Sequence, residues 1–306
     1  MNILFSSDNN YVRHLGVAIY SILCHNSRIP NFRFYIVDNE ISSENKCKLQ
    51  LMVQEFTNVE LIFIPFKNWS CSLHLNMVWP ISISAYARLF ISEMIEKDVD
   101  RVLYLDSDVL VNGDLFDLWN TDLHENVVGA VQDQVPPKTK NGVRLSPDDP
   151  YFNSGILLID LKKWREFDVT NESMRFISSH GGRIIHHDQG VLNGLLKGKW
   201  ERLPLKYNVM TIHYMMPQAK IKKFFHDESL FYNDEEIANA MQNPVILHFT
   251  PSFTTHPWEE NCKHPWSNAY REILAKTPWL GYPLEKEKNP WYLKLINWYY
   301  RNSLIS

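Results

Sequence analysis

The sequence lacks the features that mark several common classes of protein. Basic residues are not in excess, because 35 Asp and Glu outnumber 31 Lys and Arg, giving a net charge of −4 over 306 residues. This balance leaves no electrostatic footprint for DNA or RNA. No run of about 18 apolar residues is present to span a bilayer, and the N-terminus, MNILFSSD, lacks the basic and apolar regions of a signal peptide. These absences predict a cytoplasmic protein that binds no nucleic acid.

Cysteine is also scarce. The four residues Cys24, Cys47, Cys71 and Cys262 form no Cys-x-x-Cys pair and no spacing typical of a zinc site. We therefore expect mostly buried thiols in a reducing compartment. The chain contains no internal repeat and no low-complexity tract. Aromatic residues, by contrast, are plentiful, with 10 Trp and 14 Tyr, and most are expected in the core, while some are available to bind sugar rings.

Hydrophobic periodicity predicts strands that alternate with helices, a pattern typical of a largely parallel α/β sheet. The length fits one large domain with a tail or two domains equally well. Expected strands are 2–7, 32–37, 59–64, 101–105, 109–111, 127–131, 155–160 and 245–248, and expected helical segments are 15–23, 43–56, 84–95, 161–165 and 188–195.

Two segments are expected to be loops. Residues 65–80 show no clear period, and residues 134–150 are rich in Pro, Lys, Asp and Gly. Because 134–150 follows a predicted strand end, it is interpreted as mobile, either a lid over a site or a plain solvated loop. Residues 8–10, Asp-Asn-Asn, offer side chains that can cap the N-terminus of the first helix.

The most informative stretch is RVLYLDSDVLV at 101–111, where two carboxylates follow an apolar strand. Asp106 and Asp108 would point to the same side if the extended geometry continued through Ser107. Two carboxylates at such a short distance repel each other unless a cation lies between them. An Asx turn is the alternative for an arbitrary Asp-x-Asp. Ligands of open α/β sheets gather at the carboxyl ends of strands, so this context favours a metal site.

Further motifs accompany this one in a fixed order along the chain. They are SSDNNY at 6–11, SAYARL at 84–89, YLDSD at 104–108, YFNSG at 151–155, LKKW at 161–164, DQGVLN at 188–193, HFT at 248–250 and PW at 257–258. From Asn2 to about Trp258 the set resembles glycosyltransferase family 8, especially its bacterial galactosyl- and glucosyltransferases of lipopolysaccharide and lipooligosaccharide. The resemblance implies a single GT-A domain, a Rossmann-like nucleotide-sugar-binding fold with a mostly parallel sheet, at 1–265. Residues 266–306 would form a helical, basic and aromatic tail.

The resemblance also implies a divalent metal and a UDP-sugar donor. Asp106 and Asp108 would supply oxygen ligands, and His248 would supply an imidazole, although a lone histidine at a strand end is more often structural. Such ligands suit Mn²⁺, with Mg²⁺ possible. A cation there would neutralise the charge that develops on the diphosphate leaving group.

Donor-binding residues are likewise implied by the resemblance. Tyr11 would stack on uracil and Asp8 would accept its N–H, the alternatives being a core aromatic and a helix cap. Arg88 would reach sugar hydroxyls or a neighbouring carboxylate, unless it is a solvated helix arginine. Gly155 would permit close approach of the backbone. The full set is Ser7, Asp8, Asn10, Tyr11, Arg88, Asp106, Ser107, Asp108, Asn153, Ser154, Gly155 and His256.

Asp133, Asp188 and Gln189 match the positions of the family's donor-sugar contacts, and we assign them as catalytic. Family members retain the anomeric configuration, by double displacement or by attack on the same face. Double displacement needs a nucleophile beneath the anomeric carbon. Because Gln189 is a poor nucleophile, same-face attack is favoured, with a leaving phosphate oxygen taking the acceptor proton. Asp188 has an alternative role as a helix cap.

One run departs from the family pattern. Close relatives carry His-x-x-Gly-x-x-Lys-Pro-Trp, whose glycine and lysine clasp the diphosphate. Here the run from His248 to Trp258 is two residues longer, the glycine is missing and His256 replaces the lysine. A neutral histidine carries no fixed charge, so diphosphate binding is expected to be weaker or more sensitive to pH.

The C-terminal segment 285–306 mixes Lys and Arg with Trp, Tyr and Leu. This composition is typical of a segment that lies in a membrane interface, the alternative being a helix packed on the domain. The first interpretation predicts peripheral contact with the inner face of the cytoplasmic membrane.

The predicted function is transfer of galactose or glucose from a UDP-hexose to an oligosaccharide or lipid-linked glycan acceptor, such as a lipopolysaccharide or O-antigen intermediate. One alternative is a transferase acting on a protein-bound glycan or on itself. Another is a non-catalytic nucleotide-sugar-binding protein, which the replaced lysine favours. A nucleotidyltransferase is disfavoured, since residues 6–11 contain neither the glycine nor the lysine of a phosphate loop.

Overall fold

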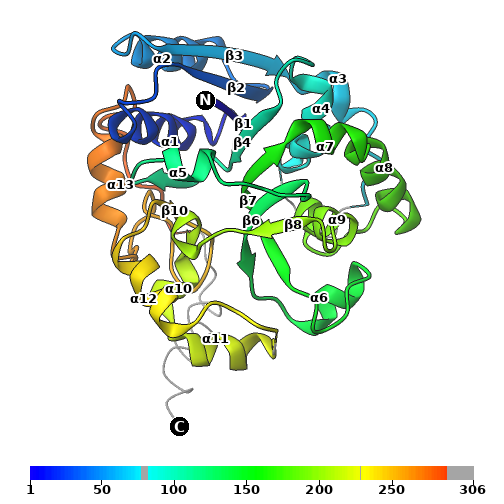
Figure 1. Cartoon of the computed structure of the whole chain (residues 1–306). Helices are drawn as coiled ribbons and strands as arrows, with labels where there is room; N and C mark the ends of the chain where they lie inside the picture. The colour runs from blue at the N-terminus through cyan, green and yellow to red at the C-terminus, as the bar shows by residue number, and fades with distance from the viewer. Residues whose placement is uncertain (77–81, 228, 288–306) are drawn as a thin grey trace.

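The computed structural model describes residues 1–76, 82–227 and 229–287 (Figure 1). Its main sheet has seven strands in the order β3-β2-β1-β4-β7-β6-β8. Pairing is parallel from β3 to β4 and again between β6 and β8, and only β7 runs antiparallel to its two neighbours. The sequence prediction of a mostly parallel α/β sheet is therefore confirmed. The strands are β1 (Asn2–Asp8), β2 (Phe32–Asn39), β3 (Val59–Pro65), β4 (Arg101–Leu105), β6 (Val128–Asp133), β7 (Tyr151–Asp160) and β8 (Trp200–Arg202).

Successive side chains of these strands point to opposite faces of the sheet, so the buried residues form two clusters, one on each face. In β1, Ile3 and Phe5 join one cluster of buried residues, whereas Leu4 joins the other. In β4, Leu103 and Tyr104 divide in the same way. Successive side chains of a strand point to opposite faces, so the sheet is covered on both sides. Such a sheet has nearly continuous apolar strands.

A second, three-stranded sheet contains His248, which the sequence predicts as a metal ligand. Its strands β5 (Val109–Val111), β10 (Ile246–His248) and β9 (Val209–Met210) lie in the order β5-β10-β9. The chain passes from the large sheet to the small one between Leu105 and Val109. His248 lies opposite Val109 on one side and Met210 on the other. This pairing holds the histidine beside the Asp-Ser-Asp segment.

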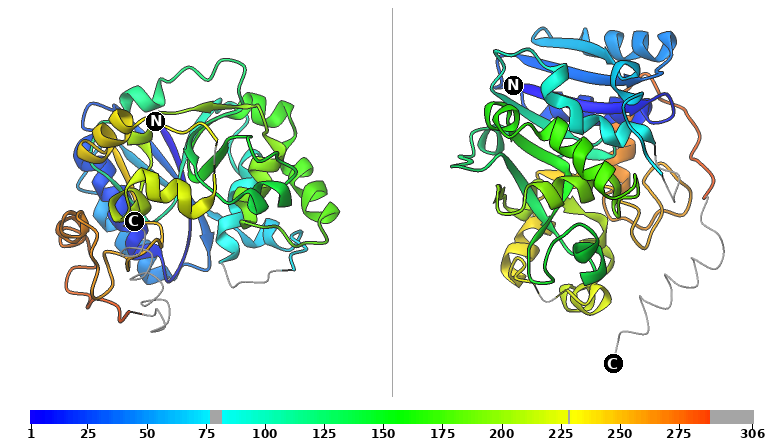
Figure 2. Two further views of the ribbon diagram at one scale, coloured as in Figure 1. Left: turned by 90° about the horizontal axis from the view of Figure 1, so that it is seen from below. Right: turned by 90° about the vertical axis from the view of Figure 1, so that its right-hand side faces the viewer.

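Helices cover the two faces of the main sheet (Figures 1 and 2). Helices α1, α2 and α12 pack with one core cluster, while η1, α4, α7, α8 and α9 pack with the other. The helices are α1 (Val12–His25), α2 (Ser43–Val53), α3 (Lys67–Ser70), η1 (Ile83–Phe90), α4 (Ile91–Met94), α5 (Phe116–Trp119), α6 (Pro137–Gly142), α7 (Leu161–Glu166), α8 (Val169–Ser179), α9 (His187–Leu195), η2 (Leu205–Tyr207), α10 (Thr211–Met215), α11 (Gln218–Phe225), α12 (Asp234–Gln242) and α13 (Ser267–Leu274).

The segment 134–150 differs from the expected mobile loop. It contains α6, and its Lys140 is fully buried, where the ammonium lies 2.8 Å from an Asp227 carboxylate oxygen and 2.8 Å from the Pro147 carbonyl oxygen. Val143 and Leu145 are also buried. The polar composition was misleading because a buried charge can be satisfied by a partner far away in the sequence. Part of the segment is therefore packed against the rest of the protein, whereas residues 146–148 are exposed.

Local expectations near the N-terminus also need correction. Helix α1 begins at Val12 without a side-chain cap, since Asp8 instead accepts the backbone N–H groups of Asn10 and Tyr11 in a turn. The predicted helix at 84–95 begins as the 3₁₀ helix η1 and only then becomes α4. The expected loop at 65–80 includes the short helix α3, and its residues 77–80 lie outside the described ranges.

The expectation of mostly buried thiols is wrong. All four cysteines are free, three of them are exposed, and Cys262 is half-buried. On α2 the buried side chains are Leu49, Met52 and Val53, and Cys47 lies on the opposite, solvent-facing side. The position of Cys47 on the helix surface therefore decides the exposure of this thiol.

Part of the C-terminal region packs against α1. Helix α13 buries Tyr270, and Trp279 lies directly over Gly16, where an added Cβ would be 2.5 Å from the indole ring. The division into a domain at 1–265 and a tail at 266–306 stays a prediction, and most of the basic, aromatic segment 285–306 lies outside the described residues. None of the helices in the described ranges has the length and apolar character needed to cross a membrane.

Candidate active site

A cavity of about 860 Å³ lies where β1, β4, β7 and β10 bring polar residues together. Segments far apart in sequence form its walls, including β1, η1, the turn after β4, the start of α9 and the end of β10. Ligands of open α/β sheets bind at such strand ends. The predicted residues that line it are Ser7, Asp8, Tyr11, Arg88, Asp106, Ser107, Asp108, Asp133, Asn153, Ser154, Asp188, Gln189 and His248.

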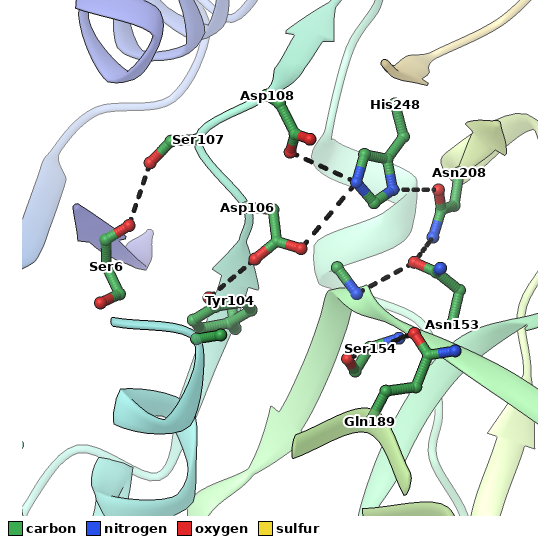
Figure 3. Close-up of polar contacts among 12 residues, drawn as sticks. Ser6, Tyr104, Asp106, Ser107, Asp108, Asn153, Ser154, Gln189, Asn208 and His248 are labelled. Carbon is green, nitrogen blue, oxygen red and sulfur yellow. Dashed lines mark hydrogen bonds and ion pairs between the residues drawn. The ribbon is translucent and has the colours of Figure 1, made fainter. Parts of the chain in front are cut away.

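Asp106, Asp108 and His248 form the only group of potential metal ligands of this kind in the described ranges, with ligand atoms within 4.8 Å of one another. The Nε2 atom of His248 lies 3.3 Å from an Asp108 oxygen and 3.9 Å from an Asp106 oxygen (Figure 3). The extended geometry does not continue through Ser107, because residues 107 and 108 form a turn. The carboxylates converge nevertheless, since Ser107 anchors the turn through a 3.0 Å bond to the Ser6 carbonyl.

The group fits a divalent cation on independent grounds. Gly155 lies directly behind it, where a Cβ would overlap Cε1 of His248 and stand 2.8 Å from an Asp106 oxygen. Space for the ligands therefore depends on the absence of a side chain at this position. Two carboxylates and an imidazole are a suitable donor set for a divalent metal. Gly155 does not itself line the cavity, and its predicted contact with the donor stays a prediction.

Electrostatics in this group follow from burial and proximity. Burial raises the pKa of Asp106, although the Arg88 guanidinium opposes the shift. For Asp108, burial acts in the same direction, but the neighbouring His248 imidazole outweighs it and lowers the pKa. The pKa of His248 is raised against the effect of burial, because Asp108 stabilises the imidazolium. A cluster of charges held this close is typical of a functional site.

Arg88 is buried and reaches two neighbouring carboxylates, one of the kinds of contact expected for it. Its guanidinium lies 2.7 Å from an Asp106 oxygen and 3.0 Å from an Asp188 oxygen, and it donates to the Ser154 hydroxyl at 3.0 Å. The Tyr104 ring lies beneath it at 4.3 Å. Arg88 is thus no solvated helix arginine. It holds two carboxylates, including one of the potential metal ligands, in fixed positions.

The three residues assigned as catalytic occupy one side of the cavity. Gln189 donates to Asp133 at 3.1 Å and accepts the Ser154 backbone N–H at 3.0 Å. Asp188 is not a helix cap, since the cap position of α9 is His186 and Asp188 is buried against Arg88. Burial raises the pKa of Asp188 to about 6, although Arg88 opposes the shift. Burial also raises the pKa of Asp133.

Residues of the nucleotide side lie at the end of β1. Asp8 accepts the Ser82 hydroxyl at 2.9 Å in addition to two backbone N–H groups, so its carboxylate is firmly oriented. Tyr11 is 40 % exposed, and its ring lies at steep angles to the rings of Trp258 and His14, with centroids 6.2 and 5.3 Å away. This exposure leaves part of the ring available for stacking. Asn10 is exposed and does not line the cavity.

His256 lies outside the cavity lining. It stacks on Trp258 with ring centroids 4.4 Å apart, and its Nδ1 atom lies 2.8 Å from a Glu259 carboxylate oxygen. The same oxygen accepts the His256 backbone N–H. The residue that replaces the family's lysine is therefore paired with a carboxylate and packed on an indole.

Sequence analysis missed one residue in the centre of this network. Asn208 is fully buried and bonds to both His248 and Asn153 (Figure 3). Its only signal in the sequence is a polar side chain between Tyr207 and Val209. The cavity also contains His213, whose ring nitrogens have no hydrogen-bond partner and whose pKa burial lowers to about 4.

A Rossmann-like sheet with an Asp-x-Asp turn at a strand end, beside a histidine, is typical of metal-dependent GT-A glycosyltransferases. The model of glycosyl transferase family 8 matches residues 2–262. General stress protein A of Bacillus subtilis is 29 % identical to this chain, in an alignment that covers 91 % of this chain and 94 % of that protein. The lipopolysaccharide 1,2-glucosyltransferase of Escherichia coli K12 is 31 % identical, in an alignment that covers 91 % of this chain and 79 % of that protein.

Among solved structures, the galactosyltransferase LgtC in complex with donor and acceptor sugar analogs is similar with a TM-score of 0.73. It is 29 % identical, covering 91 % of this chain and 96 % of that one. The chain belongs to glycosyl transferase family 8. It is a UDP-hexose glycosyltransferase of GT-A fold, in a family that uses a divalent metal and glycan acceptors. The predictions of family, fold and enzyme class are confirmed.

Proposed function

We propose that this enzyme transfers galactose or glucose from its UDP-sugar to a lipopolysaccharide or O-antigen intermediate, retaining the anomeric configuration. The observation that carries the proposal is the junction of two groups in one cavity: Asp106, Asp108 and His248 on one side, and the Asp133–Gln189 pair on the other. The acceptor class is supported by the name of one relative, a lipopolysaccharide 1,2-glucosyltransferase, and the hexose by this relative and by a galactosyltransferase.

The metal is proposed to be Mn²⁺, with Mg²⁺ as the alternative, because two oxygens and one imidazole nitrogen suit the former. Held by Asp106, Asp108 and His248, it would neutralise the charge that develops on the diphosphate leaving group. Arg88 keeps Asp106 oriented for this task, through the contact of 2.7 Å.

On the nucleotide side, Tyr11 would stack on uracil and Asp8 would accept its N–H. The exposed Tyr11 ring and the fixed Asp8 carboxylate support these roles. Ser7 and Ser107 line the same part of the cavity. Asn10 and His256 remain proposed contacts of UDP that would require the ligand to extend beyond the lining seen here.

On the sugar side, Asn153, Ser154, Asp188 and Gln189 would orient the hexose. Both ends of the Gln189 amide are already bonded, to Ser154 and to Asp133. Asp188 is bonded to Arg88. These contacts hold both side chains in place as orienting groups, which supports attack by the acceptor on the face that the diphosphate leaves.

Peripheral contact with the inner face of the cytoplasmic membrane, through residues 285–306, is part of the proposal and rests on composition alone. Co-sedimentation with vesicles rich in anionic lipid would test it. The full chain should bind and a chain ending at residue 284 should not. Equal binding of the two would remove this part of the proposal.

The decisive experiment measures UDP release from a panel of UDP-sugars, with lipooligosaccharide acceptor or without it, in Mn²⁺ or in EDTA. Asp108→Asn removes one potential metal ligand, and Asp148→Asn, an exposed carboxylate outside the cavity lining, is the matched control. We expect UDP release from one UDP-hexose in Mn²⁺. EDTA and Asp108→Asn should each abolish this release, whereas Asp148→Asn should leave it unchanged.

Two outcomes would contradict the proposal. Release that persists in EDTA would reject metal dependence at this site. Binding of UDP without release from any donor and acceptor pair would instead favour a nucleotide-sugar-binding protein.

A further inference from the structure

A chain of side-chain hydrogen bonds leads away from His248 into the interior (Figure 3). Its Nδ1 atom lies 3.0 Å from the Asn208 amide oxygen, and the Asn208 amide nitrogen donates to the Asn153 amide oxygen at 2.9 Å. The Asn153 amide nitrogen in turn donates to Asp133 at 3.3 Å. The chain therefore joins the proposed metal ligand to the proposed sugar-binding carboxylate.

The direction of this chain is determined by a group that can only donate. The backbone N–H of Gly155 donates to Asn153 Oδ1 at 3.0 Å, so that atom must be the amide oxygen. Because Asn153 Oδ1 accepts, the Asn208 atom that faces it must be the donating amide nitrogen. The oxygen of Asn208 then faces His248. Amide orientations are assigned from such networks, and here each step has one solution.

The tautomer of His248 follows from this direction. Since the amide oxygen of Asn208 can only accept, Nδ1 of His248 carries a proton and donates it. The second nitrogen, Nε2, faces Asp106 and Asp108 at 3.9 and 3.3 Å. With a cation bound, Nε2 would offer its lone pair to it. A ligating imidazole whose other N–H is bonded in this way has a fixed ring orientation.

Solvent cannot readily replace Asn208 in this role. Its side chain is fully buried, and its backbone stands between η2 and β9, where Met210 pairs with His248 itself. The strand pairing and the side-chain bond thus connect the same two segments. Removal of the amide would leave the imidazole N–H without a partner in a buried site, which is costly, and the Asn153 oxygen would keep only the Gly155 N–H.

We infer that Asn208 is a positioning residue that fixes His248 as the Nδ1–H tautomer and keeps Nε2 directed at the metal. The same amide makes the position of His248 depend on Asn153 and Asp133. The inference rests on the proposed function only in that His248 is taken as a metal ligand.

The test compares Asn208→Leu with Asn208→Asp. Leucine removes both hydrogen bonds, whereas aspartate still accepts from Nδ1 but turns an oxygen toward the Asn153 oxygen. Asn26→Leu is the matched control, because Asn26 is equally buried and its amide bonds only to backbone groups of Ile22, Gly113 and Leu115. If Asn208→Leu fails to fold, Asn208→Ala takes its place.

Two properties are measured on each variant. Calorimetry gives the Mn²⁺ affinity in the presence of UDP. Long-range ¹H–¹⁵N NMR gives the His248 tautomer in the metal-free protein, recorded at alkaline pH, where the imidazole is neutral. We expect Asn208→Leu to lose about 10- to 100-fold in Mn²⁺ affinity and to lose the Nδ1–H tautomer. Asn208→Asp should keep both the Mn²⁺ affinity and the Nδ1–H tautomer. Asn26→Leu should lower the melting temperature and change neither property.

Wild-type Mn²⁺ affinity and an unchanged tautomer in folded Asn208→Leu would overturn the inference. If wild type binds no Mn²⁺, the proposed metal site is wrong, and the NMR comparison alone then decides whether Asn208 sets the tautomer. The two failures are therefore distinguishable.

Discussion

Replacing Gly155 with alanine is the most direct test of the geometry behind the proposed metal site. Gly155 belongs to β7, and its backbone is bonded on both sides, since its N–H donates to Asn153 at 3.0 Å and its carbonyl accepts the Asp106 N–H at 2.8 Å. The backbone therefore cannot move away without disturbing both neighbours. The added methyl group would overlap Cε1 of His248 and lie 2.8 Å from an Asp106 oxygen.

The size of the effect follows from these contacts. An ordinary Cβ contact is 3.4–4 Å, so the imidazole must retreat by on the order of 1 Å, whereas metal–ligand distances tolerate about 0.2 Å. Mn²⁺ affinity should therefore fall by at least about 10- to 100-fold, the loss typical of disturbed ligand orientation. Overpacking of a buried site costs about 1–3 kcal/mol, so the protein should remain folded with a modestly lower melting temperature.

The assay is a calorimetric Mn²⁺ titration, paired with thermal unfolding in EDTA. Gly113→Ala is the control, because a Cβ at that position meets only ordinary contacts of 3.5 Å with Val245. It should bind Mn²⁺ as wild type does. A folded Gly155→Ala protein that also binds Mn²⁺ as wild type does would refute the reasoning, since the space behind His248 would then be irrelevant to the ligand set.

Two further predictions concern stability. The pKa of Asp188 is about 6 in the folded state against an ordinary 3.8, so the folded protein holds a proton that the unfolded chain releases between these values, and stability falls as pH rises through this window. A difference of about 2 corresponds to about 3 kcal/mol, so unfolding free energies in EDTA of wild type and Asp188→Asn should diverge by about that much between pH 4 and pH 7; parallel curves would contradict the assignment. Lys140→Met leaves the buried Asp227 carboxylate without its ammonium, and denaturant unfolding should show a loss of about 3–5 kcal/mol. Adding Asp227→Asn should recover part of that loss, and a single variant within about 1 kcal/mol of wild type would show that the pair is not needed.

Sequence reasoning found the parts of the site whose signal is local. The Asp-Ser-Asp segment directly follows a continuous apolar strand, and His248 ends another, so both could be placed at a sheet edge without knowledge of tertiary structure. The residues that orient them carry no such signal. Asn208 lies before β9, a strand of two residues, too short for any periodicity, and its partners lie 40 and 55 residues away in the sequence.

The segment 134–150 was misjudged for the same physical reason. Its composition is that of a solvated loop, and Lys140 reads as a surface charge. The partner that permits its burial, Asp227, lies 87 residues further along the chain. Propensity and composition describe a segment alone, whereas the burial of a charge is decided by what the fold places opposite it.

The charge balance of the cavity connects these observations to the chemistry. Five carboxylates line it, whereas Arg88 is the only lysine or arginine among the described lining residues, and its guanidinium is committed to Asp106, Asp188 and Ser154. A UDP diphosphate would bring further negative charge, and two like charges about 6 Å apart repel by roughly 3 kcal/mol at an effective dielectric constant of about 20. Among the described lining residues, no lysine or arginine is therefore left free to meet the diphosphate. A divalent cation and UDP must then each raise the affinity of the other by the same factor, and the Mn²⁺ titrations, repeated with and without UDP, measure that factor directly.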